Sequence, residues 1–324
     1  MKEAKKSPAS IKQIPFKDLI ALVTSLVVVM ILAEIFIPGF IAPNHLLLVL
    51  YINFPLSMLA IAETIVVLSG EIDFSVGAIF WNVIVIGAWL MRGEHLLLPI
   101  LICLLMGIVV GLINGIFTSI LRIPSFITTL GMMIILTGIM YIVGVSSAVG
   151  RASLMLSSFA VGRTFSVPNL IWVLTIFLIV TFIILEFTTF GWTVRALGSN
   201  ARAVYCSGVN PVTTKMLVFI ISGLISAVTG LLWLGYQAIP YPKFEGGVGV
   251  GASLSLEALA AVVIGGTQFI GGKGGIHRTF TGVLIISVLS SMMVSFGLGY
   301  EWQQILYGLI IFLVMVAYMR ARVS

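Results

Sequence analysis

Residues Val194–Leu231 read VRALGSNARAVYCSGVNPVTTKMLVFIISGLISAVTGL, and this stretch decides how the rest of the chain is arranged. It places a polar segment of small residues between two strongly apolar segments. Asn200 is a good N-cap and Gly208 a natural left-handed stop, so we expect a short helix over Ala201–Cys206. The pair Asn210–Pro211 then predicts the N-cap and first position of the next helix. This short helix is either a structured loop or a surface element that passes motion to a partner.

The composition places the chain in a lipid bilayer. Of its 324 residues 60% are hydrophobic and only 9% are charged, and the mean hydropathy of +1.21 is far outside the soluble range. The net charge of +6 does not indicate a nucleic acid partner, because the basic residues lie between apolar segments and at the chain ends. Cys103 lies in an apolar run and Cys206 in the short helix, so neither a disulfide framework nor a metal site is expected.

Ten apolar segments approach the length of about twenty residues that spans a bilayer, although two of them are short. They are Asp18–Pro38, Leu46–Ser69, Val76–Met91, Leu97–Leu121, Ser125–Val145, Pro168–Phe187, Val212–Tyr236, Leu254–Gly266, Thr279–Phe296 and Gln303–Met319. We therefore expect an all-α polytopic membrane protein of about ten transmembrane helices. A single transmembrane domain over residues 18–319 would lie between a cytoplasmic N-terminal segment, residues 1–17, and a cytoplasmic tail, residues 320–324.

The basic residues predict the orientation. With a cytoplasmic N-terminus, the segments outside the cell hold four basic residues, Arg92, Arg151, Arg163 and Lys243. The inside segments hold Lys2, Lys5, Lys6, Lys12, Lys17, Arg122, Arg195, Arg202, Lys215, Lys273, Arg278, Arg320 and Arg322. This positive-inside bias places both termini and the short helix in the cytoplasm. Ten spans then divide into two five-span halves of opposite topology, an arrangement that allows an inverted repeat.

Small residues predict close helix packing in the fourth span. Gly107, Gly111 and Gly115 stand four residues apart and form one stripe on a helix, which lets another backbone approach closely. The long outside segment, Ser146–Val167, is polar and rich in serine. It could contact an external partner, but we expect a solvated connector.

A polar break, SGEIDFSVG at Ser69–Gly77, interrupts otherwise continuous membrane sequence with Glu71, Asp73 and Ser75. Charges at membrane depth cost roughly 2.5–3.5 kcal/mol each, so these acids must lie at an interface, line a wet cavity or cap a helix. Asp73 or Ser75 as N-cap of the third span is the simplest expectation. Glu63 in the second span is a candidate proton or cation site, and it is either protonated or turned toward a partner subunit.

The glycine-rich loop GGTQFIGGKGG, Gly265–Gly275, invites a phosphate-binding interpretation that its spacing excludes. A P-loop needs glycine where Thr267 stands and serine or threonine where Gly274 stands. We expect a cytoplasmic turn between two helices.

Four residues inside apolar segments are candidates for a translocation path: Asn53, Trp81, Asn82 and Asn114. Amides bind hydroxyl groups and an aromatic face contacts sugar C–H surfaces, but each residue can equally serve in helix packing, so both interpretations stay open. The sequence contains no arrangement typical of a catalytic triad or a metal cluster, so we expect no catalytic residue, no metal and no enzymatic activity.

Three patches occur in order: SGEIDFSVGA at Ser69–Ala78, ALGSNARAVYCSGVN at Ala196–Asn210 and EALAAVVIGGTQFIGGKGG at Glu257–Gly275. Together they resemble the signature stretches of permease subunits of ATP-binding-cassette (ABC) importers for monosaccharides, the ribose, xylose, arabinose and galactose type. The resemblance extends from Leu46 to Tyr318. It implies inward transport of a sugar by alternating access, in a multi-pass protein of the bacterial inner membrane.

The resemblance also implies partners. Two permease subunits, identical or different, would form the pathway, two cytoplasmic ATPases would bind the ATP, and a periplasmic or lipid-anchored binding protein would deliver the sugar. This chain would then carry no cofactor of its own. Its short helix resembles the coupling helix that docks on the ATPase, with the corresponding residues Gly198, Asn200, Ala201, Arg202, Ala203, Ser207, Gly208 and Asn210.

Some positions depart from that family's pattern, since Glu71 stands where glycine is frequent and Phe74 where leucine is usual. These departures leave the particular sugar undetermined. Two alternatives stay open. One is a permease for another small polar solute such as a branched-chain amino acid. The other is a stand-alone secondary transporter in which Glu63, Glu71 and Asp73 would be the ion-linked groups.

Overall fold

The structure is a computed structural model that describes residues 16–93, 96–146, 150–239 and 249–323. Most of the predicted N-terminal segment, and the predicted outside residue Lys243, lie outside this part of the chain. The described residues form helices and one small hairpin: α1 Phe16–Phe36, α2 Pro43–Ile52, α3 Phe54–Leu68, α4 Val76–Leu90, the 3-10 helix η1 Met91–Gly93, α5 Leu97–Ser119, α6 Ser125–Ser146, α7 Leu154–Val161, β1 Arg163–Thr164, β2 Val167–Pro168, α8 Asn169–Phe187, α9 Thr189–Cys206, α10 Pro211–Gln237, α11 Gly249–Ile264, α12 Ile276–Ser295 and α13 Tyr300–Val323.

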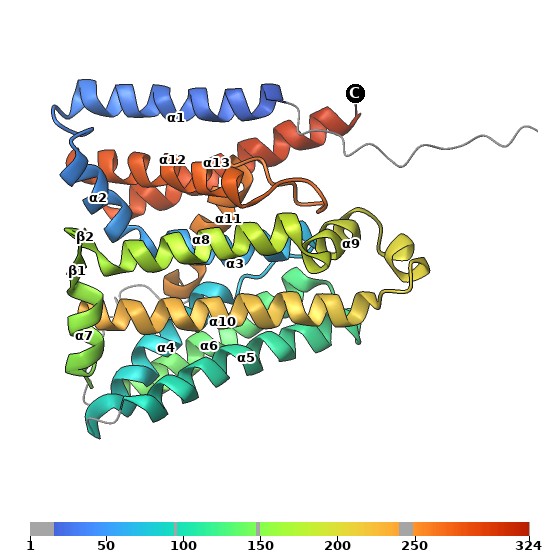
Figure 1. Ribbon diagram of the computed structural model, residues 1–324, viewed down its shortest axis with the longest axis horizontal. Coiled ribbons are helices and arrows are strands. Elements are labelled where there is room, and N and C mark those ends of the chain that lie inside the picture. The colour runs from blue at the N-terminus through green and yellow to red at the C-terminus, as the bar shows by residue number, and fades with distance from the viewer. Residues whose placement is uncertain (1–15, 94–95, 147–149, 240–248, 324) are drawn as a thin grey trace, which may run out of the picture.

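The chain folds as a helical polytopic membrane protein whose long helices run roughly side by side (Figure 1). Within the described residues, α5, α6, α8, α10 and α12 are each long and apolar enough to cross a bilayer, and the bent pair of α2 and α3 counts as a sixth span if the two helices cross together. Helices α1, α4 and α11 contain shorter apolar stretches. Each of the ten predicted segments coincides with a helix or a helix pair. Length and composition therefore establish five or six spans, and the count of ten stays a prediction.

The second predicted span is not one straight helix. Helices α2 and α3 meet at Asn53 with a bend of 59°. Pro55 stands in the first turn of α3, where its missing N–H leaves the carbonyl one turn earlier without the usual partner. The Asn53 amide donates to the Val49 carbonyl at 2.9 Å and closes the end of α2. The bend corrects the prediction of a continuous segment over Leu46–Ser69.

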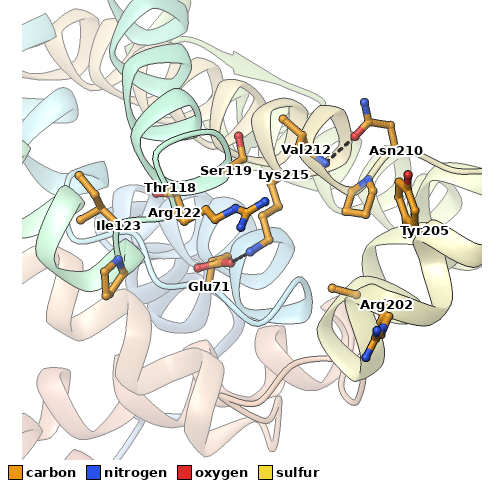
Figure 2. Close-up of a pocket in the computed structure, with 13 residues that line it drawn as sticks. Glu71, Thr118, Ser119, Arg122, Ile123, Arg202, Tyr205, Asn210, Val212 and Lys215 are labelled. Atoms are coloured by element: carbon orange, nitrogen blue, oxygen red, sulfur yellow. Dashed lines mark hydrogen bonds and ion pairs between the residues drawn. The ribbon is translucent and has the colours of Figure 1, made fainter.

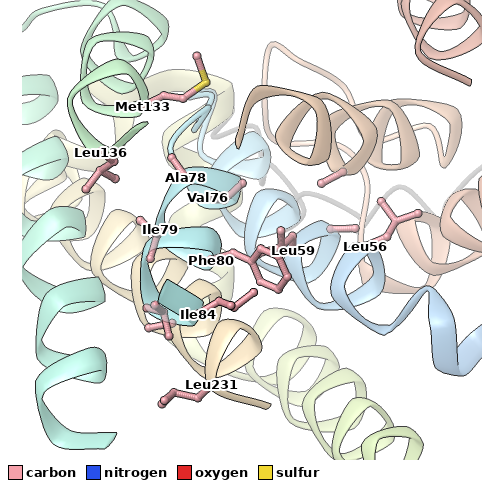
Figure 3. Packing of buried hydrophobic residues seen from close by; sticks show 14 of the residues in the cluster. Leu56, Leu59, Val76, Ala78, Ile79, Phe80, Ile84, Met133, Leu136 and Leu231 are labelled. Carbon is pink, nitrogen blue, oxygen red and sulfur yellow. The ribbon is translucent and has the colours of Figure 1, made fainter. Parts of the chain in front are cut away.

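Helix α3 lies at the centre of the bundle. Every one of its residues is buried, which is the pattern of a helix that is apolar on all sides and surrounded by protein. Helices α4 and α10 pack beside it, and Leu59, Phe80, Ile84 and Leu231 belong to one apolar cluster between them (Figure 3). The helices around this centre, such as α5, α6 and α8, turn many large apolar side chains outward, as expected of surfaces that face lipid.

The predicted glycine stripe packs α5 closely against α10. A methyl group on Gly107 would overlap the carbonyl oxygen of Gly223, and one on Gly111 would overlap that of Phe219. The two backbones therefore approach as closely as the absence of side chains permits, which confirms the predicted role in helix packing.

The segment predicted to lie outside is more ordered over its described residues, 150–167, than a solvated connector. It contains α7, whose N-cap Ser153 accepts a hydrogen bond from the Leu156 N–H at 3.3 Å, and then the hairpin of β1 and β2. Helix α7 packs against Gly235 near the end of α10, with Ala160 buried at the contact. The connector prediction was wrong because polarity and serine content obscured a capped helix of only two turns.

The α5–α10 contact yields a first prediction. Gly111→Ala should lower the free energy of unfolding by about 1–3 kcal/mol, because the added methyl group forces two packed backbones apart. The measurement is the thermal unfolding midpoint of the purified protein in detergent. Gly131→Ala on α6 is the matched control, because a methyl group there meets nothing within 4 Å, and it should leave the midpoint unchanged or raised. Equal midpoints for the two variants would contradict the packing.

Candidate functional site

The predicted short helix is present and is bounded as the sequence indicates. Helix α9 is interrupted at Asn200, whose backbone is extended at φ −163° and ψ 94°. The Asn200 side-chain oxygen accepts from the N–H groups of Arg202 at 3.0 Å and Ala203 at 3.1 Å, which is the geometry of an N-cap. Gly208 ends the helix at φ +85°. The short helix over Ala201–Cys206 is therefore a separate unit, turned away from the first part of α9.

The start of α10 also follows the prediction. The Asn210 side-chain oxygen accepts from the Val212 N–H at 2.9 Å, and Pro211 occupies the first helical position. Only Val204 of the short helix is buried against the rest of the protein, whereas Tyr205 is 71% exposed. The short helix thus presents most of its surface to its surroundings.

The three signature patches meet in space at their glycines. Gly198 of α9 lies between the backbone of the polar break and that of the glycine-rich loop, and a methyl group on it would overlap the Leu68 carbonyl and the Gly271 Cα atom. The Gly272 N–H donates to the same Leu68 carbonyl at 2.9 Å. We call this contact of Gly70, Gly198, Gly271 and Gly272 the glycine junction. Segments about 130 and 70 residues apart are joined there by direct contacts between their backbones.

Arg195 reinforces the glycine junction from α9. Its guanidinium donates to the Gly274 carbonyl at 2.6 Å and forms an ion pair with Glu186 at the end of α8. In the sequence, Arg195 stands out only as one of the basic residues that predict the orientation. Its role in holding the glycine-rich loop depends on the Gly274 carbonyl, about eighty residues away along the chain. No local sequence pattern indicates that contact.

Asp73 holds the polar break together. Its side chain is 1% exposed and accepts from the Ser75 N–H at 2.9 Å, the Ser75 hydroxyl at 2.6 Å and the Ser222 hydroxyl of α10 at 3.0 Å. Ser75 is the N-cap residue of α4, as one of the two predicted candidates, but its side chain makes no capping hydrogen bond to that helix. The Ser75 hydroxyl instead binds Asp73, and Asp73 binds Ser222 of α10.

Glu63 faces the polar break from α3. It is 1% exposed, and its carboxylate accepts from the Asp73 N–H at 3.2 Å. A side chain buried in this way does not reach a partner subunit, which corrects one of the predicted orientations. Its second oxygen has no partner among the described residues.

Four further helices bind the polar break through polar side chains that lie inside apolar sequence. Asn114 of α5 donates to the Ser75 hydroxyl at 2.9 Å, and Ser222 of α10 binds Asp73. Ser125 and Thr129 of α6 accept from the N–H groups of Ile72 and Phe74, both at 3.1 Å, and Ser255 of α11 accepts from the Gly77 N–H at 2.9 Å. The hydroxyl groups among these were not predicted. Their only signal was a hydroxyl residue inside an apolar span.

The four candidate path residues occupy different positions. Asn53 closes the bend of α2 and α3, and Asn114 binds the polar break. The buried Asn82 amide donates across to the Leu136 carbonyl of α6 at 2.8 Å. Trp81 is partly buried and packs edge to face against Phe80, with ring centroids 5.2 Å apart. Each asparagine therefore serves helix structure or packing here, and a role in a solute path stays a prediction.

A groove of about 560 Å³ lies between the short helix and the polar break (Figure 2). We call it the short-helix groove, and its walls are Glu71, Thr118, Ser119, Arg122, Ile123, Pro124, Ala201, Arg202, Tyr205, Asn210, Pro211, Val212 and Lys215. Lys215 of α10 and Glu71 of the polar break form an ion pair in its wall. Three basic residues that were predicted to lie on the inner side, Arg122, Arg202 and Lys215, thus line the same groove.

Comparison of the sequence with known proteins assigns the chain to a family. The family described as branched-chain amino acid transport system / permease component matches residues 45–315. The chain belongs to this permease family. The permease is 29% identical over 302 residues to the ribose import permease protein RbsC of Escherichia coli strain K12, covering 92% of this chain and 91% of that one. No solved structure matches the permease.

Two further relatives come from the same strain. The probable ABC transporter permease protein YphD is 32% identical over 300 residues, covering 90% of the permease and 87% of the relative. The galactofuranose transporter permease protein YtfT is 30% identical over 263 residues, covering 81% and 76%. The identification of the permease with the monosaccharide type of ABC importer permease is thereby confirmed, in preference to the amino-acid and ion-coupled alternatives.

The glycine junction yields a second prediction. Gly198→Ala should push the glycine-rich loop away from α9, because the methyl group overlaps backbone atoms that cannot rotate aside. Limited trypsin digestion of the purified permease should then cut faster after Lys273, an exposed residue of that loop. Gly138→Ala, where a methyl group meets nothing within 4 Å, is the control and should leave the rate unchanged. Identical rates for the wild type and Gly198→Ala would contradict the close contact.

Proposed function

We propose that this permease forms the membrane pathway of a sugar importer and that the short helix receives the motion generated by a separate ATPase. The observation that carries the proposal is the short helix itself, which is capped at both ends, exposed on most of its surface and joined directly to the glycine junction. A rigid surface element of this kind suits a partner that pushes or pulls on it.

The exposed side chains of the short helix favour a protein partner. Tyr205 is 71% exposed and Arg202 is also exposed, while Val204 anchors the helix to the permease. Tyrosine and arginine are the residues enriched at the centres of protein interfaces. The proposed coupling residues are Gly198, Asn200, Ala201, Arg202, Ala203, Ser207, Gly208 and Asn210. Tyr205 is added to this set because its side chain is exposed on the short helix.

The proposed solute is a monosaccharide, because relatives similar over most of their length are named for the import of ribose and galactofuranose. The ATP would be bound by the cytoplasmic ATPase, since the glycine-rich loop lacks the P-loop residues. A sugar-binding protein outside the membrane and a second permease subunit complete the proposed assembly. The chain itself would carry no cofactor and catalyse no reaction.

We further propose ten spans in the bacterial inner membrane, with both termini in the cytoplasm. The spans would be α1, the pair of α2 and α3, α4, α5, α6, α8, α10, α11, α12 and α13, in one transmembrane domain over residues 18–319. Arg122, Arg202 and Lys215 line one groove beside the short helix, whereas Arg163 stands in the hairpin at the opposite end of the bundle (Figure 1). This separation supports the sidedness predicted from the charges.

The orientation is tested by labelling cysteine. The chain has two free cysteines, Cys103, which is buried, and Cys206, which is exposed on the short helix. A membrane-impermeant maleimide should label Cys206 in inside-out vesicles and not in intact cells. Cys206→Ser should abolish the signal, and Cys103→Ser should leave it unchanged. Labelling of Cys206 in intact cells would contradict the cytoplasmic placement.

The docking role is tested by binding of the ATPase. Tyr205→Ala should weaken binding of the purified permease to its ATPase by about tenfold or more, because a central aromatic contact contributes 2 kcal/mol or more. Phe165→Ala is the matched control: this aromatic residue is 88% exposed but lies in the hairpin at the other end of the bundle, and its removal should leave ATPase binding unchanged.

The importer as a whole is tested in liposomes. The permease with its ATPase and binding protein should take up sugar only when ATP is present on the side of the short helix. Uptake by the permease alone, driven by a proton or sodium gradient, would instead support the ion-coupled alternative and overturn the proposal.

A further inference from the structure

The ion pair between Lys215 and Glu71 connects the two elements that a coupling mechanism has to link. Lys215 stands one turn after Pro211, at the start of α10 and directly beyond the short helix. Glu71 is the third residue of the polar break. We propose that this ion pair is a positioning contact that transmits movement of the short helix to the polar break. The proposal rests on the proposed function and adds a specific residue pair to it.

In the proposed transmission, movement passes first from the short helix to α10. The two are separated only by Ser207–Asn210, and Gly208 at φ +85° and the Asn210 cap fix the path of this connection. A displacement of the short helix therefore moves the first turn of α10, and with it Lys215. The short-helix groove, about 560 Å³ in volume, leaves room for such a displacement, and Figure 2 shows the Lys215 side chain extending from α10 toward Glu71.

Movement of Lys215 would then pass to Glu71 through the ion pair. The Lys215 and Glu71 side chains are 25% and 12% exposed, so water and salt screen the pair less than an open surface pair. Among the described residues, this is the one ion pair between α10 and the polar break. Because neither charge has another ionic partner in this part of the chain, separating the pair is unfavourable, and the two groups tend to move together.

The third step leads from Glu71 into the bundle. Ile72 donates its N–H to Ser125 of α6, and Asp73 binds Ser75 and Ser222. The polar break is thus a short segment held by several hydrogen bonds, which limit its freedom to deform. A shift at Glu71 is passed to Asp73 and then to the start of α4.

A purely structural ion pair would change stability when broken and leave the transport obtained per ATP unchanged. A positioning pair would change that ratio. This difference separates the two roles.

The experiment compares four proteins in liposomes with the ATPase, the binding protein and ATP: wild type, Glu71→Lys, Lys215→Glu and the double exchange. Sugar uptake and ATP hydrolysis are measured together. Each single exchange places two like charges side by side, so uptake per ATP should fall by about tenfold or more. The double exchange restores opposite charges and should recover most of the ratio. Lys215→Arg, which keeps the charge, should remain close to wild type.

Stability controls keep the test decisive. The unfolding midpoint of each variant is measured in detergent. Arg92→Glu, which reverses an exposed charge in η1 just after α4, serves as the control substitution. If a single exchange fails to insert, Glu71→Gln and Lys215→Met, which remove one charge each without repulsion, take its place with the same expectation.

The outcomes distinguish the two proposals. Single variants with wild-type uptake per ATP, or a double exchange no better than the singles, would overturn the role of the pair while the proposed function stands. A loss of uptake that follows the unfolding midpoint, with the ratio to ATP hydrolysis unchanged, would also overturn it. A wild-type assembly that takes up no sugar with ATP would overturn the proposed function and the pair with it.

Discussion

Peptide groups outside a helix have to find hydrogen-bond partners inside a membrane protein, because lipid offers none. The polar break meets this requirement for its N–H groups, since every backbone N–H from Ser69 through Ser75 has an acceptor. The acceptors include carbonyl groups of α3 and side chains from α3, α6 and the break itself, while α5, α10 and α11 bind its polar side chains or its flanking residues. The relative positions of these helices thus depend on one irregular segment. It is the natural place for a change in one part of the bundle to reach the others.

Local signals allowed much of the fold to be predicted. The ten predicted apolar segments matched helices or a helix pair. Asn200, Gly208 and Asn210 correctly marked the ends of the short helix and the start of α10, because a capping residue contacts backbone groups within three residues of its own position. The glycine stripe of α5 was interpreted correctly for the same reason, since its spacing alone defines a face. The bend at Asn53 and the helix α7 were missed because apolar length hides a break and polar content hides a short helix.

The contacts at the candidate site were largely beyond prediction. Asp73 was recognised as unusual, but its partner Ser222 is about 150 residues away and looks like any serine in a span. The same holds for Ser125 and Ser255, whose hydroxyl groups accept backbone hydrogens of the polar break. Only the fold brings these groups together. The resemblance of three separate patches was informative for a physical reason, since all three meet at the glycine junction.

The glycine junction also limits how the permease can move. Gly198 already touches the backbones of two other segments, so the three segments cannot come closer at this residue, and the atoms in contact there are backbone atoms that have no rotamer to change. The junction is therefore a fixed point that cannot be compressed. Any rotation of α9 about it would displace the far ends of the helices more than the junction itself.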